Sequence, residues 1–239
     1  MIIREEYIGN QRLILGDCLQ VKGTLGRFDA VVTDPPYGIK RVKGFGTGCN
    51  AGWGGFYARR EGVKRYQGNW DRERPPKEFF REALQSAPNA IIWGGQFFAD
   101  ALPPQGKWLW WDKCQTMPSF GDGELAWTTL PGDAPKKFVY SNNGLMAKEK
   151  DRVHPTQKPV ALMEWCLGFL PDAKTILDPF MGSGTTLVAC QRMGRHGTGI
   201  EIDPGHFDSA CRRVDEAARQ PDLLIPETRA APVQEGFDL

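Results

Sequence analysis

The stretch KTILDPFMGSGTT, residues 174–186, places a short apolar run directly before a glycine-rich turn. Residues 174–177 have the β-branched and apolar composition of a buried strand. The turn that follows contains Gly182 and Gly184, and the residues after it have the pattern of a helix. A second strand, residues 198–202, comes next along the chain. Strand, glycine turn, helix and strand in this order predict an α/β fold with parallel strands.

An acidic residue near the end of the second strand, Glu201, completes a nucleoside-binding layout. Glycines let a ligand approach the backbone, and Glu201 has two oxygens for two ribose hydroxyls. The third glycine of a dinucleotide-binding loop is missing, as is the Gly-Lys-Ser/Thr sequence of a phosphate loop. Asp178 would repel a diphosphate but suits a cationic amino group, so S-adenosylmethionine fits better. The alternative is a glycine-rich turn inside an α/β core.

A stiff turn lies earlier in the chain, where Asp34-Pro35-Pro36-Tyr37 follows the β-branched run 28–33. Neither proline can donate to a strand ladder, and each restricts the residue before it. The turn therefore fixes a carboxylate, proline carbonyls and an aromatic face at a strand's carboxyl end, where α/β sheets bind ligands. Tyr37 could stack on a flat ring while Asp34 and the Pro35 carbonyl accept its amino hydrogens. The alternative is a proline turn capped by a buried tyrosine.

The whole chain has the size and composition of an ordinary folded protein. Its 239 residues suit one domain, or one domain with an insertion. No apolar run reaches the roughly 18 residues of a membrane span, and the first residues lack a signal peptide's apolar stretch, so we expect a soluble, cytoplasmic protein. Six scattered cysteines without a Cys-x-x-Cys pair and three histidines predict no disulfide, zinc site or other metal site.

The net charge of +1 is uninformative, but residues 38–75 carry nine basic and three acidic side chains. This stretch is also rich in glycine and aromatic residues. Basic residues interleaved with aromatics suit phosphate contact and base stacking, whereas the alternative is a solvated loop. The candidate DNA-binding residues are Lys40, Arg41, Lys43, Arg59, Arg60, Lys64 and Arg65.

The remaining pattern predicts further elements of an α/β sheet. We expect strands at residues 12–15, 90–93, 107–112 and 138–140, a helical piece at 97–102, and helices after Pro76, Pro159 and Asp203. Four tryptophans are expected to pack in the core or the sheet. They are Trp108, Trp110, Trp111 and Trp127.

Four motifs together resemble the β-class DNA amino-methyltransferases, in which the catalytic motif precedes the cofactor motif. They are Asp34-Pro35-Pro36-Tyr37, His154-Pro155-Thr156-Gln157-Lys158-Pro159, Asp178 to Thr186, and Gly199-Ile200-Glu201-Ile202-Asp203. The resemblance runs from Leu13 to Val214. Release-factor and ribosomal-RNA amino-methyltransferases share the Pro-Pro-Tyr/Phe element, but theirs comes after the glycine loop.

The resemblance implies a Rossmann-like methyltransferase sheet, mostly parallel and doubly wound, with one antiparallel strand and a small target-recognition insertion. It implies S-adenosylmethionine as cofactor and catalysis by Asp34, Pro35, Pro36 and Tyr37. The methionine end would contact the glycine loop and Lys158, Glu201 would hold the ribose, and Asp17 would take the adenine amino group. The implied cofactor-binding residues are Asp17, Cys18, Asp34, Lys158, Asp178, Phe180, Gly182, Ser183, Gly184, Thr185, Glu201 and Ile202.

The implied reaction is methylation of the exocyclic N6 amino group of an adenine flipped out of double-stranded DNA. Asp34 stands where cytosine enzymes tend to have serine, which resembles the adenine group. The alternatives are an N4-cytosine methyltransferase and a catalytically inactive DNA-binding relative. A homodimer and a cognate restriction enzyme, as in restriction-modification, are further candidate partners.

The motifs also suggest a division of the chain. We expect a catalytic half at residues 1–37 and 76–112, a DNA-contacting loop at 38–75, a target-recognition region at 113–153, a cofactor-binding half at 154–219 and a tail at 220–239.

Overall fold

The computed structural model describes residues 1–39, 73–115, 121–141 and 157–220. Its strands are β1 (Ile2–Ile8), β2 (Gln11–Gly16), β3 (Ala30–Thr33), β4 (Asn89–Trp93), β5 (Trp108–Asp112), β6 (Gly123–Thr128), β7 (Lys136–Val139), β8 (Thr175–Asp178) and β9 (His196–Glu201). Its helices are α1 (Cys18–Val21), α2 (Lys77–Ser86), α3 (Val160–Gly168), α4 (Thr185–Arg192) and α5 (Pro204–Arg219), with 3-10 turns at Lys22–Thr24 and Gly95–Phe98.

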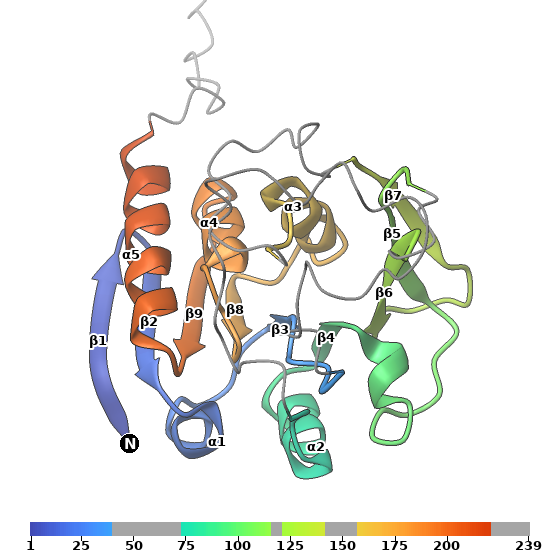
Figure 1. Cartoon of the computed structure of the whole chain (residues 1–239), viewed down its shortest axis with the longest axis horizontal. Coiled ribbons are helices and arrows are strands. Elements are labelled where there is room, and N and C mark those ends of the chain that lie inside the picture. Colours follow the sequence, from blue (N-terminus) through green and yellow to red (C-terminus); the bar gives the residue numbers. More distant parts are fainter. Residues whose placement is uncertain (40–72, 116–120, 142–156, 221–239) are drawn as a thin grey trace, which may run out of the picture.

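The nine strands of the described residues form one sheet in the order β1-β2-β9-β8-β3-β4-β6-β5-β7, which crosses Figure 1 from left to right. Strands β2, β9, β8, β3 and β4 are parallel to one another. The order reverses between β8 and β3, because β3 leads to β4 on one side and β8 leads to β9 on the other. Open α/β sheets bind ligands at the carboxyl ends of strands at such a switch point. Asp34 and Asp178 both lie there.

Helices cover both faces of the sheet, since alternate residues of each strand point to opposite sides. Leu13 of β2 and Val32 of β3 pack in the cluster with α3, α4 and α5. Their neighbours Ile14 and Val31 pack in the opposite cluster with α1, α2 and Phe98. Figure 1 shows α3, α4 and α5 in a row in the upper part of the view and α1 and α2 in the lower part. The doubly wound α/β fold predicted from the sequence is therefore confirmed.

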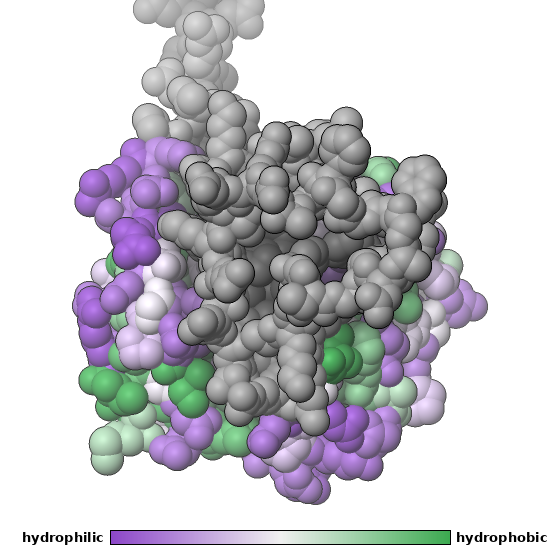
Figure 2. Space-filling model, viewed as in Figure 1, coloured by the Kyte–Doolittle hydropathy of each residue, from purple (hydrophilic) through white to green (hydrophobic). Residues whose placement is uncertain are grey.

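Helix α5 illustrates how the sequence sets an element. Its cap residue Asp203 accepts a hydrogen bond from the backbone N–H of His206 at 2.8 Å, as expected, and Pro204 occupies the first turn. Phe207 and Val214 face the core, while Figure 2 shows hydrophilic side chains on the outer surface over α5. No helix among the described residues combines the length and apolar character needed to cross a bilayer.

The structure differs from the sequence-based expectation in two details. Two strands, β1 and β6, run antiparallel to their neighbours instead of one. The β1 strand was not predicted because Arg4, Glu5 and Glu6 interrupt its apolar pattern, and it returns to β2 through a turn at Gly9, whose φ is +55°. Trp110, expected to pack in the core or the sheet, lies on β5 against Gly123 of β6 and is 38% exposed, whereas Trp111 and Trp127 are buried.

The predicted target-recognition region contains two strands of the main sheet. Strand β6 pairs with both β4 and β5, and β7 extends the sheet beyond β5. The described part of residues 113–153 is therefore continuous with the sheet that carries Asp34. The proposed division of the chain into functional regions stays a prediction.

A carboxylate fastens the beginning of β3 to the beginning of β8. Asp29 accepts hydrogen bonds from the backbone N–H groups of Lys174 and Thr175 at 2.8 Å each and from the Thr175 hydroxyl at 2.9 Å. These hydrogen bonds, those of Thr175 first, lower the pKa of Asp29. The charged side chain thus aligns the two strands that meet at the switch point.

We predict that Asp29→Ala lowers the free energy of unfolding by about 1–2 kcal/mol at pH 7, because three donors lose a charged acceptor. A folded-state pKa below the ordinary value means that this stabilisation is present above pH 4 and is lost as the pH falls through the folded-state pKa. Urea unfolding at pH 7 and pH 3 would measure both effects, with the exposed Asp172→Ala as the control. An equal loss at both pH values would contradict the assignment.

Candidate active site

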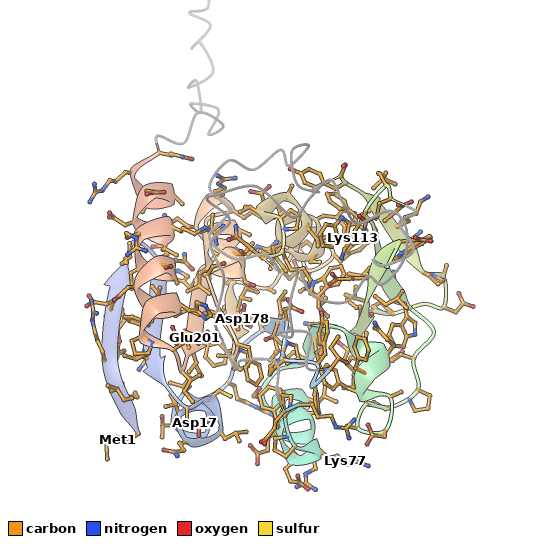
Figure 3. All side chains as sticks on the ribbon, in the orientation of Figure 1. Met1, Asp17, Lys77, Lys113, Asp178 and Glu201 are labelled. Atoms are coloured by element: carbon orange, nitrogen blue, oxygen red, sulfur yellow. The ribbon has the colours of Figure 1, made fainter. Side chains whose placement is uncertain are left out.

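A cavity of about 80 Å³ opens where β2, β8 and β9 end. Its lining comes from these strand ends and the loops after them: Gly16, Asp17, Cys18, Pro179, Phe180, Ile200, Glu201 and Ile202. Five of the predicted cofactor-binding residues are among them. Figure 3 shows Asp17, Glu201 and Asp178 lying in one part of the molecule, although they come from three different strand ends.

Glu201 is held in place by backbone donors on two loops. One carboxylate oxygen accepts from the N–H of Gly182 at 2.9 Å, and the other accepts from Ile202 at 3.0 Å and Asp203 at 2.8 Å. Burial raises the pKa of Glu201, and these backbone donors oppose the rise. The carboxylate therefore ties the glycine turn to the end of β9 while it faces the cavity.

Ile202 and Asp17 give the rest of the cavity its character. Ile202 is 67% exposed, so a flat apolar group can lie against it. Asp17 directly precedes α1, and its Oδ1 accepts from the N–H of Leu19 at 2.9 Å, which fixes the side chain. A cavity lined by an apolar side chain and two carboxylates suits a nucleoside, which has a flat ring, an amino group and a diol.

The glycine turn is shaped by two close packing contacts. Gly182 and Gly184 have φ angles of +51° and +76°, which favour glycine. A Cβ on Gly184 would lie 2.9 Å from the Cβ of Ala210 in α5, so only glycine lets the two elements approach. Arg213, also in α5, donates to the carbonyl of Ser183 at 2.6 Å and to the hydroxyl of Thr185 at 3.0 Å. Helix α5 thus fixes the position of the glycine turn through Ala210 and Arg213.

Asp178 links the cavity region to the proline turn. It is 3% exposed, and its Oδ1 accepts from the Thr33 hydroxyl at 2.7 Å and from the N–H of Phe180 at 3.2 Å. Burial raises the pKa of Asp178 to about 6, although hydrogen bonds from Thr186, Thr33 and Phe180 oppose it. Because Thr33 directly precedes Asp34, this hydrogen bond joins the two predicted centres.

The proline turn presents Tyr37 in a fixed orientation. Its ring stacks on Phe97 with centroids 4.9 Å apart, and its hydroxyl donates to Oδ1 of Asp34 at 2.6 Å. Gly94 has a φ of +70°, and a Cβ there would lie 2.1 Å from Cε1 of Tyr37. The absence of a side chain at Gly94 therefore makes room for the ring.

Lys158 lies between two carboxylates. Its Nζ is 2.5 Å from Oδ2 of Asp34 and 2.8 Å from Oε2 of Glu124, and its side chain is only 5% exposed. The faces of Tyr37 and Trp93 are each 5.7 Å away, measured from Nζ to the ring centroid. A lysine so enclosed keeps its charge only because acceptors surround it.

A second lysine completes a cluster of two acids and two bases. Lys113, which follows β5, contacts the other oxygen of Glu124. Burial opposes ionisation of Glu124, but Lys158 and Lys113 outweigh it and lower the pKa of Glu124 to about 2. Burial raises the pKa of Asp34, which Lys158 opposes, and the two acids raise the pKa of Lys158 against the effect of its burial. We call these four residues the Lys158 cluster.

The structure places the sequence-predicted residues in two adjoining groups. Asp17, Cys18, Phe180, Glu201 and Ile202 line the cavity, whereas Asp34, Pro35, Pro36, Tyr37 and Lys158 lie at the end of β3. Five further predicted residues do not line the cavity: Asp178 hydrogen-bonds to Thr33 of β3, Ser183 and Thr185 hydrogen-bond to Arg213 of α5, and Gly182 and Gly184 belong to the same glycine turn. Asp34 is not among the residues that line the cavity. The predicted roles of all these residues stay predictions.

Sequence reasoning missed the supporting residues Glu124, Lys113, Arg213 and Gly94. Glu124 lies in the unpredicted β6, and no short motif marks it. Each of the four motifs consists of residues that are consecutive in sequence, so residues that reach the site from other parts of the chain are not found by them. The candidate DNA-binding residues between Lys40 and Arg65, and residues 154–156 of the His-Pro motif, lie outside the described part of the structure.

A cavity lined by Asp17 and Glu201 thus lies beside the proline turn at the switch point of the sheet, where α/β proteins bind their ligands. Comparison with known proteins indicates the class of protein. Residues 104–212 match the family model described as DNA methylase, N6_N4_Mtase. At the family level, the predicted resemblance to DNA amino-methyltransferases is confirmed.

Individual relatives agree with this class. The type II methyltransferase M.HpaI of Haemophilus parainfluenzae is 43% identical over 80 residues, which span 33% of this chain and 26% of that protein. The chain thus matches about a quarter of the length of M.HpaI. The Escherichia coli (strain K12) protein YubD, a methylase by name, is 28% identical over 90% of this chain and 98% of its own.

Solved structures share the fold. M1.HpyAVI in complex with S-adenosylmethionine superimposes with a TM-score of 0.54 at 24% identity, over 85% of this chain and 99% of that one. The cytosine-N4-specific PvuII DNA methyltransferase gives a TM-score of 0.58 at 14% identity, over 89% and 90%.

The buried acid of β8 yields a prediction about stability. A raised folded-state pKa means that the stability is fully present below the ordinary value of 3.8 and is lost as the pH rises through about 6. We predict that Asp178→Asn, which keeps an oxygen for Thr33, stabilises the protein at pH 8 by up to about 3 kcal/mol and by much less at pH 4.

Urea unfolding at the two pH values would measure this difference. Asp172→Asn, an exposed position next to the same strand, is the matched control and should change little at either pH. Destabilisation by Asp178→Asn at pH 8 would show that the charged carboxylate is the favoured folded form.

Proposed function

We propose that this protein is a DNA methyltransferase that transfers a methyl group from S-adenosylmethionine to an exocyclic amino group of a DNA base, adenine N6 in preference. The observation that carries the proposal is the pairing of β3 with β8. This pairing brings the proline turn, Asp34 to Tyr37, beside the cavity that Glu201 lines. Family membership of the matched region supports DNA as the substrate.

The residues at the cavity suit S-adenosylmethionine. Ile202 offers an apolar surface for adenine, and Asp17 an acceptor for its amino group. Glu201 lines the cavity with a carboxylate that the Gly182 N–H helps to hold in place, and it would accept from the two ribose hydroxyls. A Cβ on Gly182 would meet nothing within 4 Å, which leaves the turn open to a ligand chain. Bound in this way, S-adenosylmethionine supplies a methyl group on a sulfonium centre that a nucleophile can take in line.

The proline turn would receive the target base. Tyr37 is fixed by Phe97 and can stack on the flipped ring, while Asp34 and the Pro35 carbonyl accept the two amino hydrogens. Accepting both hydrogens turns the nitrogen lone pair toward the neighbouring cavity. The Asp34 carboxylate then stabilises the positive charge that grows on the nitrogen, a contact that strengthens in the transition state.

The aspartate at position 34 favours adenine over cytosine as the target base. Asp34 stands where the cytosine-N4 group tends to have serine, and a carboxylate accepts more strongly from an amino group that gains charge. The fold does not distinguish the bases, since the PvuII protein, cytosine-N4-specific by name, has the same one. Cytosine N4 is therefore the second candidate.

A label-transfer experiment tests the function. We expect tritiated methyl groups from S-adenosylmethionine to enter unmethylated duplex DNA, and nucleoside analysis of the product to give N6-methyladenine. N4-methylcytosine would support the second candidate. Absence of label, with the protein folded and binding sinefungin, would favour the inactive DNA-binding relative.

The role of Asp34 gives a variant prediction. Asp34→Ala should lower turnover by at least about 100-fold because it removes a transition-state contact, while sinefungin binding changes by less than about threefold. Initial rates and calorimetric titration would measure the two. The exposed Asp100→Ala, three residues after Phe97 in sequence, is the control. Equal loss of turnover and binding would instead mean that the carboxylate is structural.

A further inference from the structure

The Lys158 cluster contains two charged residues, Glu124 and Lys113, that have no role in the proposed reaction. Asp34 and Lys158 belong to predicted motifs, but Glu124 lies on β6, a strand without a recognised motif. Its side chain is 20% exposed, and it contacts both lysines of the cluster. Burying a second acid and a second base costs free energy, so a role beyond packing is worth seeking.

In the structure, both carboxylate oxygens of Asp34 already have partners, whereas the proposed reaction needs them to accept from the amino group of the target base. Its Oδ2 lies 2.5 Å from Nζ of Lys158, and its Oδ1 accepts from Tyr37. A carboxylate paired so closely with an ammonium attracts a developing positive charge less than a free one. A base amino group that becomes cationic needs the full charge of Asp34.

Glu124 offers the ammonium another acceptor without a large movement. Oε2 of Glu124 is already 2.8 Å from Nζ, compared with 2.5 Å for Oδ2 of Asp34. The lysine is enclosed by Tyr37 and Trp93, so its ammonium has acceptors on two sides and rings on two others. A shift of a few tenths of an ångström suffices to favour Glu124.

We propose that Glu124 is a positioning residue that draws the Lys158 ammonium off Asp34 when the target base enters. The Asp34 carboxylate then faces the amino group with its full negative charge. This inference rests on the proposed function, because only a substrate that competes for Asp34 gives Glu124 this task. Lys113 holds Glu124 from the other side and keeps its carboxylate in place.

The test compares three variants of the full chain with the wild type. Glu124→Gln keeps the shape and removes the charge, Glu124→Asp keeps the charge, and the exposed Asp122→Asn removes a nearby charge outside the cluster. The measurements are kcat and the KM for S-adenosylmethionine on unmethylated duplex DNA, sinefungin affinity by calorimetry, and the thermal midpoint.

We expect Glu124→Gln to lower kcat by about 10- to 100-fold, the effect of losing a hydrogen bond to a charged group, while KM and sinefungin affinity change by less than about threefold. Glu124→Asp should recover part of kcat, and Asp122→Asn should match the wild type. The thermal midpoint of Glu124→Gln should fall by several degrees, because Lys158 and Lys113 lose a charged acceptor, so the rates are compared well below that midpoint.

Two results would overturn the inference while the proposed function stands. One is a wild-type kcat in Glu124→Gln, and the other is a parallel loss of kcat and sinefungin affinity, which means a structural role. A wild type that transfers no label to DNA overturns the proposed function, and the inference with it.

Discussion

The hydrogen bond from the Thr33 hydroxyl to Asp178 joins two strand ends that are 145 residues apart in sequence. Strands β3 and β8 are parallel neighbours at the point where the sheet order reverses, so their carboxyl ends open into the same crevice. Asp29 fastens the opposite ends of the same two strands. Every feature of the site depends on this pairing, because the proline turn continues from β3 and the glycine turn from β8.

Charge is concentrated where the strands meet, and the buried charged groups named above have partners. Glu201 accepts from three backbone donors, Asp178 from two hydroxyls and a backbone N–H, and Lys158 lies between two acids. A buried charge without such partners would cost several kcal/mol, so the surrounding strands must hold these donors rigidly. The same packing that stabilises the charges thus fixes their orientation toward a ligand.

The sequence predicted much of the fold because local patterns carry it. The runs at 90–93 and 174–177 and the Asp203 cap depend on short-range composition, and each is found where expected. Strand β1 and strand β6 were missed because charged or mixed residues obscure their alternation. Glu124 could not be predicted, since its contact with Lys158 exists only after β6 has paired with β4. Motifs indicate chemistry, whereas long-range pairing decides which side chains support it.

The position of β8 has a consequence for how the chain acquires its structure during synthesis. This strand inserts between β3 and β9, yet β3 leaves the ribosome about 140 residues earlier. Contacts so distant in sequence form slowly, and one side of β3 has no partner strand until they do. The growing polypeptide therefore carries an apolar, unpaired strand edge through most of translation, a surface of the kind that chaperones bind.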